Sequence, residues 1–431
     1  MKSVWPALAI LLSTGLSAGG ACAASAAPAP LPPALVIPEP DRGITIDAAL
    51  AASAAANIDL VTARNAIKSA AAGVRIADTA PNPTLNYNLG HFQIHPDPQQ
   101  GGQQLDNVFS VDLPLERGGK RNARVGAAKA GLAAADSDAN DAGRQVRAAV
   151  AGAFYDLMAA ERKLAVNMRI ADSYRTSQGL ADRRLAAGAI SGGDLAKQNV
   201  DTLRAVSTLS HAVSDRREAQ LALAILIGQE AAAPALKTIG DWPAQRAAVA
   251  EDPETLADRR PDVRAAVQRL EAARYQLKGA HALRHPDITA SAQYEHDPGA
   301  FGNTFGVGLS LPIPVRNAYN GEVDSAGAGL AQSDALAAKA RAVAIADIIT
   351  ARRAATDATA RRETYENALL PAARRAAQTA EFSYKNGALA LLDLLDARRT
   401  LQSVELDAVD AHNDEAHALA RLAAAESAGD E

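Results

Sequence analysis

The hydrophobic and polar positions of this chain follow the same order twice. Residues 81–230 and residues 284–427 each contain a short alternating stretch, a loop, a second alternating stretch that ends in Leu-Pro, and a long Ala-rich run broken once at a Gly. The Leu-Pro pair at 113–114 corresponds to the pair at 311–312. Because a repeated order of elements indicates a repeated structural unit, the pattern predicts an internal duplication.

The alternating stretches predict two β-hairpins, one in each repeat. In the first, residues 84–92 lead into a polar Pro/Gly loop and residues 108–115 return. In the second, residues 288–294 alternate more regularly and residues 304–312 return. A period of two residues is typical of strands with two different faces. Four strands leave open sheet edges, so we expect either that the hairpins lie on a soluble body or that several chains combine their strands.

The Ala-rich runs predict very long helices. Residues 122–187 keep a helical period without Pro, residues 319–384 do so apart from Pro371, and further helices are expected at 192–227 and 389–425. At ~1.5 Å per residue, each of the first two would be about 100 Å long. An isolated helix of that length is not stable in water, so the helices must pack side by side along narrow apolar seams. The expected seam residues are Val146, Val150, Phe154 and Leu157 in the first repeat and Leu394, Ala397, Leu401 and Val404 in the second.

The ends of these patterns divide the chain into five segments. The N-terminus has a positive residue, Lys2, then an apolar stretch and the small-x-small sequence at 21–23, as in a secretory signal. The first repeat is expected to open with one helix from Ile46 to Asp78, which begins at Thr45 or Asp47. The five segments are a signal peptide at 1–23, an extended Pro/Ala arm at 24–45, a first structural repeat at 46–230, a linker or equatorial segment at 231–256, and a second structural repeat at 257–427.

Composition narrows the class of protein. Hydrophobic residues make up 48% of the chain but aromatic residues only 4%, which favours an extended, mainly α architecture with a small β part over thick globular cores. Positive and negative side chains are interleaved and the net charge is −5, so we expect no nucleic-acid partner. After the signal peptide no stretch offers about eighteen uncharged apolar residues. A membrane crossing would therefore require a closed β-barrel.

Cys22 is the only cysteine, which excludes an intramolecular disulfide. The residues before it loosely resemble a lipoprotein cleavage site, so Cys22 is a candidate for lipidation. The alternative is that it leaves with the signal peptide or stays inert. The eight His residues form no recognisable ligand set, and we expect neither a metal site nor a cofactor.

Three features together resemble a known family. They are the duplicated order of elements, the Gly-centred breaks LAAGAISGGDL (185–195) and YKNGALALLDL (384–394), and the junction LPLERGGKR (113–121). From about residue 46 to residue 425 the chain resembles the TolC family of outer-membrane efflux proteins. The resemblance implies a homotrimer in outer-membrane lipid. Each chain would give four strands to a shared twelve-stranded β-barrel and long helices to an α-helical barrel in the periplasm.

Within the family, PLERGGKR (114–121) resembles the CzcC-like branch that serves heavy-metal cation pumps. The implied function is a passive exit duct, not an enzyme, for divalent cations of the cobalt, zinc and cadmium type. It would dock onto an inner-membrane pump, of RND type, through a periplasmic adaptor. An outer-membrane channel for drugs or other small organic molecules stays open as an alternative. A periplasmic adaptor is the alternative from another class, although adaptors usually have one helical hairpin and not a doubled set.

The resemblance also suggests a gate at the periplasmic end. Tyr384, Asp393 and Asp396 fall on the family's constriction positions, and the two Asp residues share one helix face. A trimer would place six carboxylates around one axis, where they attract cations and repel one another. In the alternative interpretation the Asp pair lies on an ordinary solvated face and Asp396 neighbours Arg399. The TolC pattern has an Arg where this chain has Leu389, so that latch is not implied.

Three further positions mark the turns that would dock the adaptor, namely Gly188, Asp194 and Gly387. Lys197 stands where a second Asp would complete the first turn.

The residues Gly118, Gly119, Lys120 and Arg121 lack the spacing of a phosphate-binding loop and are interpreted as a flexible strand-to-helix junction at the barrel rim. Lys120, Arg121 and Arg124 would then meet lipid phosphates.

Overall fold

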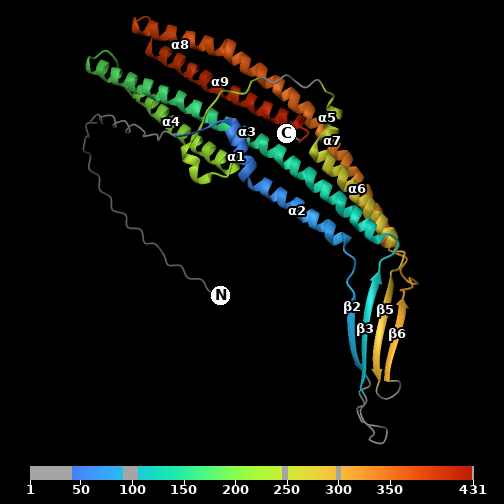
Figure 1. The fold of residues 1–431 in the computed structure, drawn as a ribbon. Coiled ribbons are helices and arrows are strands. Elements are labelled where there is room, and N and C mark those ends of the chain that lie inside the picture. The colour runs from blue at the N-terminus through green and yellow to red at the C-terminus, as the bar shows by residue number, and fades with distance from the viewer. Residues whose placement is uncertain (1–40, 91–104, 245–250, 298–301, 430–431) are drawn as a thin grey trace, which may run out of the picture.

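The protein is long and curved, with a β-sheet at one end and two helical turns at the other (Figure 1). The computed structural model describes residues 41–90, 105–244, 251–297 and 302–429. The expected signal peptide at 1–23, Cys22 and most of the Pro/Ala arm lie outside the described residues. The expectation of a mainly α protein with a small β part is confirmed.

The first helical segment differs from the prediction. In place of one helix there are two, α1 (Ile46–Ala56) and α2 (Ile58–Asp78), separated by Asn57 in an extended conformation. The Asn57 side chain accepts hydrogen bonds from the amides of Asp59 and Leu60 and donates one to the carbonyl of Leu226, 169 residues away. The single-helix prediction is therefore wrong because a distant carbonyl favours a break that the local Ala-rich sequence does not signal. The expected cap at Thr45 is confirmed, since its hydroxyl accepts from the Ala48 amide.

No described helix is by itself long and apolar enough to cross a membrane; α1 and α2 meet that criterion only as a pair, and the pair is bent by 42°.

The long helices of the first repeat are present. They are α3 (Lys120–Ala186) and α4 (Gly192–Leu226), which lie side by side (Figure 1). The four expected seam residues of α3 are all buried and belong to the largest apolar cluster, together with side chains of α1 and of the end of α4. Lateral packing, not helix propensity, therefore stabilises this 67-residue helix.

The second repeat contains α6 (Pro261–Ala282), α7 (Asn320–Thr364), α8 (Leu370–Lys385) and α9 (Leu391–Glu426). A π-helical turn, η3 (Tyr365–Leu369), joins α7 to α8 without a break. It precedes Pro371, whose ring would clash with a carbonyl in a regular α-helix, and the wider turn accommodates it. Of the expected seam in α9, Leu394 is buried and the other three residues are half-buried.

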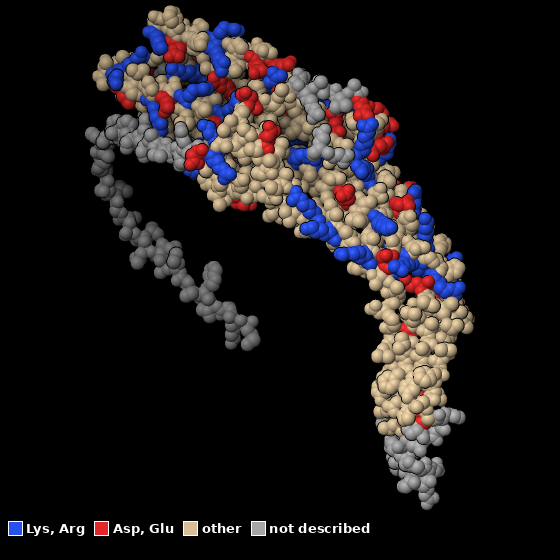
Figure 2. All heavy atoms as spheres, in the orientation of Figure 1, with Lys and Arg blue, Asp and Glu red and all other residues tan. Residues whose placement is uncertain are grey.

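Four antiparallel strands form the sheet. They are β2 (Thr84–Gly90), β3 (Asp106–Leu115), β5 (Ile288–Asp297) and β6 (Gly302–Ser310), in the order β2-β3-β5-β6. Both hairpins are as expected, and the β3–β5 pairing joins the two repeats in one sheet. Charged side chains cover the helices, whereas the sheet has few (Figure 2).

The segment between the repeats packs on the helices at mid-length. It contains a 3₁₀ helix, η2 (Glu230–Ala235), the strand β4 (Leu236–Thr238), and α5 (Pro253–Arg259). β4 pairs in parallel with β1 (Arg42–Ile44).

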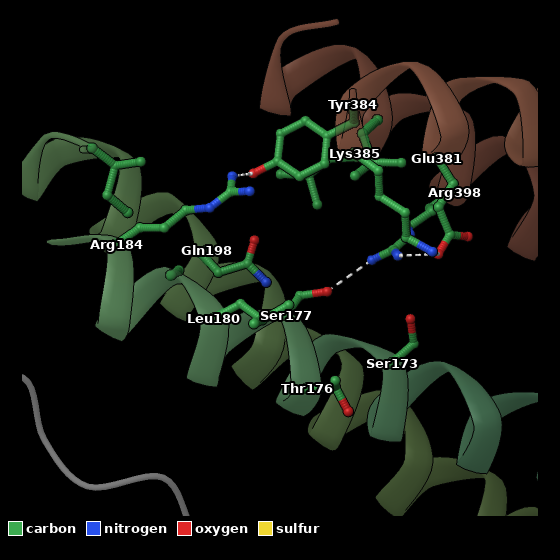
Figure 3. A pocket seen from close by; sticks show the side chains of 14 residues that line it. Ser173, Thr176, Ser177, Leu180, Arg184, Gln198, Glu381, Tyr384, Lys385 and Arg398 are labelled. Carbon is green, nitrogen blue, oxygen red and sulfur yellow. Dashed lines mark hydrogen bonds and ion pairs between the residues drawn. The ribbon is translucent and has the colours of Figure 1, made fainter. Parts of the chain in front are cut away.

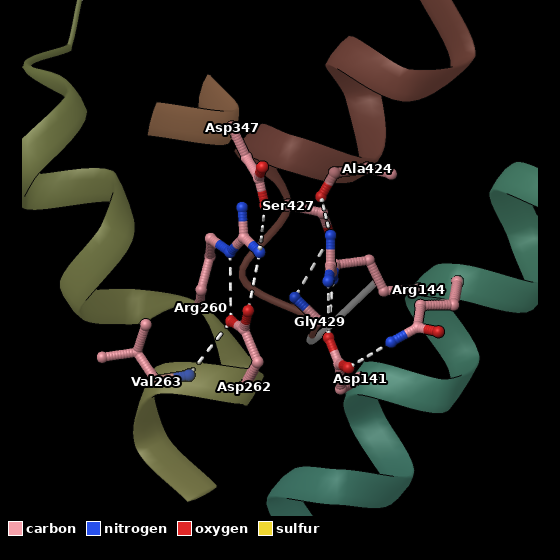
Figure 4. A network of polar contacts seen from close by, with 10 residues as sticks. Asp141, Arg144, Arg260, Asp262, Val263, Asp347, Ala424, Ser427 and Gly429 are labelled. Atoms are coloured by element: carbon pink, nitrogen blue, oxygen red, sulfur yellow. Dashed lines mark hydrogen bonds and ion pairs between the residues drawn. The ribbon is translucent and has the colours of Figure 1, made fainter. Parts of the chain in front are cut away.

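Charged contacts hold the helices together at this level (Figure 4). The buried Arg260 is hydrogen-bonded to Asp262 and lies 3.4 Å from Asp347 of α7. Arg144 of α3 donates to the carbonyl of Ala424 at the end of α9.

Candidate functional site

One face of the sheet is an exposed apolar surface. The register aligns one aromatic residue from each strand in a row across the sheet, Tyr87, Phe109, Tyr294 and Phe305. Ring centroids within each hairpin are 4.7 and 5.2 Å apart. Next to this row, toward the helices, lie further exposed apolar residues, among which Val307 is 93% exposed. The others on that face include Leu85, Val111, Leu113 and Leu309. A contiguous exposed apolar surface of this kind marks a contact with lipid or protein.

Gly118 and Gly119 let the chain turn from β3 into α3. Their φ angles are +70° and +80°, a region that favours Gly. A Cβ on Gly118 would also lie 2.6 Å from the Cβ of His285, which is too close for any other residue type. Gly118 therefore serves a tight packing contact between the two repeats, whereas Gly119 serves the turn alone.

The cations after this turn have carboxylate partners within the chain. Lys120 contacts Asp287 at 2.9 Å and Arg121 contacts Asp78 at 3.0 Å. Burial acts to raise the pKa of Asp287, but the hydrogen bonds from Lys120 and from the amide of Arg117 outweigh it and hold that pKa below its ordinary value. These contacts tie the start of α3 to the end of α2 and to the residue before β5, where sheet and helices meet. The lipid-phosphate role of the cations stays a prediction.

Arg124 makes a bidentate contact at this junction. Its guanidinium holds both carboxylate oxygens of Glu116, at 2.7 and 3.2 Å, and donates to the carbonyls of Ala77 and Thr79. The pKa of Glu116 is lowered, mainly by this hydrogen bond.

The first turn, between α3 and α4, is closed by a capping box. Gly188 adopts a φ of +69°, and Ser191 caps α4. The Ser191 hydroxyl accepts from the Asp194 amide at 3.1 Å, and the Asp194 carboxylate accepts from that hydroxyl at 2.8 Å. This hydrogen bond lowers the pKa of Asp194. Asp194 thus has a structural task, satisfying polar groups at a helix start; its part in adaptor docking stays a prediction.

The second turn, between α8 and α9, has the same backbone and different chemistry. Gly387 adopts a φ of +73°, but the capping position is Ala390, which has no side-chain acceptor. Asp393 and Asp396 are exposed, and neither has an ion-pair partner among the residues that the structure describes.

Arg399, the partner that the solvated-face interpretation gave to Asp396, instead contacts both carboxylate oxygens of Asp201 on α4 at 2.6 Å. The two carboxylates at the start of α9 are therefore available to solvent and to cations.

An arginine joins the two turns. Arg184, in the last turn of α3, donates from Nη1 to the hydroxyl of Tyr384, in the last turn of α8 (Figure 3). The guanidinium carbon also lies 5.0 Å from the centre of the Tyr384 ring, within cation–π range. The structure therefore brings Tyr384 together with the first repeat, and the described residues show no hydrogen bond between Tyr384 and Asp393.

Sequence reasoning missed Arg184. The available signal was its place four residues before Gly188, one position away from the equivalent of Tyr384, which lies three residues before Gly387. Both side chains therefore come from the last helical turn before a break, but the pattern does not say which faces meet. Within the described ranges, no group of three or more His, Cys, Asp or Glu is arranged to hold a metal ion.

Comparison with known proteins identifies the family. Residues 49–229 and 253–426 match the family described as outer membrane efflux protein. The chain is 28% identical over 365 residues to the cobalt-zinc-cadmium resistance protein CzcC of Cupriavidus metallidurans, covering 83% of this chain and 84% of that protein. It is 24% identical over 373 residues to the pyoverdine export outer membrane protein OpmQ of Pseudomonas aeruginosa, covering 81% and 78%.

The fold is similar to that of a solved structure. The outer membrane protein VceC of Vibrio cholerae aligns with a TM-score of 0.76 at 20% identity, over 88% of this chain and 95% of that one. With the family match over most of the sequence, the chain belongs to the outer membrane efflux protein family, in the outer membrane with its helices in the periplasm.

Proposed function

We propose that this protein is the outer-membrane channel of a tripartite efflux system and exports divalent heavy-metal cations. It acts as a homotrimeric, passive duct, and its partners are an inner-membrane pump of RND type and a periplasmic adaptor. Membership of an efflux family favours transport over catalysis. The choice of cargo rests on one observation: Asp393 and Asp396 are exposed and have no ion-pair partner within the ranges that the structure describes.

The sheet supports the trimer. Within the described residues β2 and β6 each have one strand neighbour, so both sheet edges are open. Open edges beside an exposed apolar face are not viable in lipid, whereas strands pooled from several chains close them. The aromatic row then lies at a membrane interface, where such residues are enriched in outer-membrane barrels. Four strands from each of three chains form the shared barrel.

Two observations support cations as cargo. The similarity to CzcC, whose name refers to cobalt, zinc and cadmium, is the first. The second is electrostatic, because three chains would present six carboxylates at the second turns, and a ring of acidic side chains selects cations. The similarity to OpmQ, whose name refers to pyoverdine export, supports the alternative of an organic cargo on the same fold.

The contact between Arg184 and Tyr384 supports a gate at the turns. It links α3 to α8, so it must break if the two helix pairs are to separate. Gly188 and Gly387 allow the tight turns whose surfaces receive the adaptor in this proposal.

The test uses a strain that lacks this gene. Cell-associated zinc, cobalt, cadmium and copper are measured beside retention of a fluorescent, drug-like dye. We expect raised metal and unchanged dye, with rescue by the intact gene and by Asp194→Asn, but not by the double variant Asp393→Asn/Asp396→Asn. Raised dye with unchanged metal would overturn the metal cargo while leaving the channel in place. Equal rescue by both variants would show that the carboxylates of Asp393 and Asp396 are not needed for metal export.

A further inference from the structure

A cavity separates the two helix pairs just below the turns. It has a volume of about 430 Å³ and lies between α3 and α4 on one side and α8 and α9 on the other (Figure 3). Small-molecule sites commonly have volumes of about 300–1,000 Å³ and combine an apolar lining with a few polar groups. The Arg184–Tyr384 contact borders the cavity.

One buried amide points into the cavity. Gln198 of α4 is 1% exposed, and neither its Oε1 nor its Nε2 has a hydrogen-bond partner among the described residues. Figure 3 shows its side chain directed into the space between Arg184 and Ser177. Buried amides without hydrogen bonds are uncommon because losing water is unfavourable, so an unpartnered donor and acceptor at one point indicate a missing ligand or water.

The charges around the cavity favour an anion. Three cations line it, Arg184, Lys385 and Arg398, against one carboxylate, Glu381. Lys385 holds that carboxylate at 3.1 Å, whereas the nearest Arg398 nitrogen is 3.8 Å away, beyond hydrogen-bond range. The Arg398 side chain is 22% exposed, and its Nη1 donates a hydrogen bond to the neutral hydroxyl of Ser177 at 2.8 Å. Within the described part of the chain, this mostly buried guanidinium therefore has a carboxylate at ion-pair distance but none within hydrogen-bond range.

Apolar side chains also line the cavity, beside the hydroxyls of Ser173, Thr176 and Ser177. Leu394 and Leu395 of α9 are each 3% exposed and face the cavity together with Leu180 of α3 and Ile190 of the first turn. A hydrated inorganic ion would gain nothing from these side chains, whereas a ring or a short alkyl chain would bury apolar area against them.

We propose that this cavity binds a small carboxylate that bears a ring or a short alkyl chain. The carboxylate lies between Arg398 and the Gln198 amide nitrogen, Arg184 and Lys385 draw it to the mouth, and the apolar part packs on Leu394 and Leu395. The inference goes beyond the proposed function, because binding depends on neither conduction nor the cargo. It would join the two helix pairs beside the turns.

The test measures binding of 4-(trifluoromethyl)benzoate to the full-length protein in lipid nanodiscs by fluorine NMR line broadening. Empty nanodiscs correct for partition into lipid. The neutral 4-(trifluoromethyl)benzyl alcohol and the cationic 4-(trifluoromethyl)benzylamine report charge selectivity. We expect saturable binding of the benzoate, displaced by unlabelled benzoate, and at least tenfold weaker binding of the other two probes.

Two variants locate the site. Gln198→Leu and Arg398→Gln should each weaken benzoate binding at least tenfold. Gln178→Leu, which removes another buried amide from α3 outside the cavity, and Arg183→Gln should leave it unchanged. The thermal unfolding midpoints of the wild type and of Gln198→Leu are compared to exclude misfolding. They should agree, since Leu fits among the apolar side chains of the cavity.

Absence of saturable benzoate binding overturns the proposal, and a cavity that holds only water would give this result. Equal benzoate binding by Gln198→Leu and the wild type also overturns it. Binding of the alcohol or the amine that is stronger than binding of the benzoate would show that the ligand is not an anion. Cation selectivity of the channel is measured on the same preparation. Its result tests the proposed function, and the benzoate result tests the binding site, so either proposal can fail without the other.

Discussion

The two turns at the helical end have the same backbone and use the same aspartate differently. Each follows a Gly with a positive φ, and each places an Asp six residues later, Asp194 in the first and Asp393 in the second. In the first turn Ser191 binds the carboxylate in a capping box; in the second, Ala390 stands at the matching position and cannot. One hydroxyl therefore decides whether the carboxylate stabilises a helix start or stays free.

The surrounding charges follow the same division. Three residues after each Asp, the first turn has Lys197 and the second has Asp396. The first turn thus combines one acid with one base, and the second combines two acids. A duplicated unit can keep its geometry in both copies while only one copy acquires an acidic surface, because exposed side chains contribute little to the fold.

The largest expected effect is on ion selectivity, which should depend on the carboxylates of the second turn and not on that of the first. Removing both charges of the second turn with Asp393→Asn/Asp396→Asn should lower the cation-over-anion permeability ratio about tenfold, because a ring of like charges concentrates counter-ions. Asp194→Asn should change the ratio little, since its carboxylate is engaged by Ser191. Planar-bilayer recordings at low salt measure both. A similar loss for both changes would show that the turns are electrically equivalent.

The capping Ser should act in the same way in either turn, so removing it from the first turn and adding it to the second should have opposite effects. Ser191→Ala removes a helix cap and should destabilise the start of α4 by about 1 kcal/mol, which speeds local amide exchange about fivefold. Ala390→Ser should slow exchange at the start of α9 by a similar factor. Hydrogen exchange followed by mass spectrometry on peptides covering 191–197 and 390–396 measures both. Unchanged exchange after Ser191→Ala would contradict the capping role.

The contact between the turns should hold the resting state closed. Arg184→Gln and Tyr384→Phe should each raise the resting conductance about threefold, because an exposed polar contact is worth at most about 1 kcal/mol. Arg183→Gln is the matched control, since Arg183 is an exposed neighbour for which the described residues show no ion pair. A conductance that rises equally in the control would mean that net charge, not the contact, sets the resting state.

The smallest expected effect is that the stability of the start of α4, at the first turn, depends on pH, whereas that of the start of α9 does not. The pKa of Asp194 lies below its ordinary value of 3.8 in the folded protein, so its contribution to stability is present above that value and is lost as the pH falls through the lowered pKa. Amide exchange at the start of α4, corrected for its intrinsic pH dependence, should therefore accelerate in acid. Ser191→Ala should abolish this dependence; if the dependence survives in that variant, another group causes it.

Elements with a regular period could be predicted, as could the two breaks at Gly188 and Gly387, but two other interruptions could not. Both hairpins, the long helices and the buried seam of α3 follow from periods of two and of about 3.6 residues. The break at Asn57 depends on a hydrogen bond to Leu226, and the π-helical turn depends on how a continuous helix absorbs Pro371. Neither has a local signature, because an Ala-rich run with one Pro is compatible with several outcomes.

The candidate site divides in the same way. Gly188, Gly387 and the Asp pair of the second turn were visible as a repeated spacing, but the partners were not. Arg399 contacts Asp201, and Arg184 contacts Tyr384, across about 200 residues of sequence. The unpartnered Gln198 has no sequence signature either, since burial of a single amide depends on four packed helices.

The sequence by itself determined the duplication, the type of each long element and the family resemblance, because each is encoded in the order and spacing of residues along the chain. Only the tertiary structure decided the joining of the hairpins through β3 and β5, the aromatic row across the sheet, the use of Asp194 as a cap, and the cavity below the turns. All of these depend on which faces meet, and that is set by packing between residues far apart in the chain.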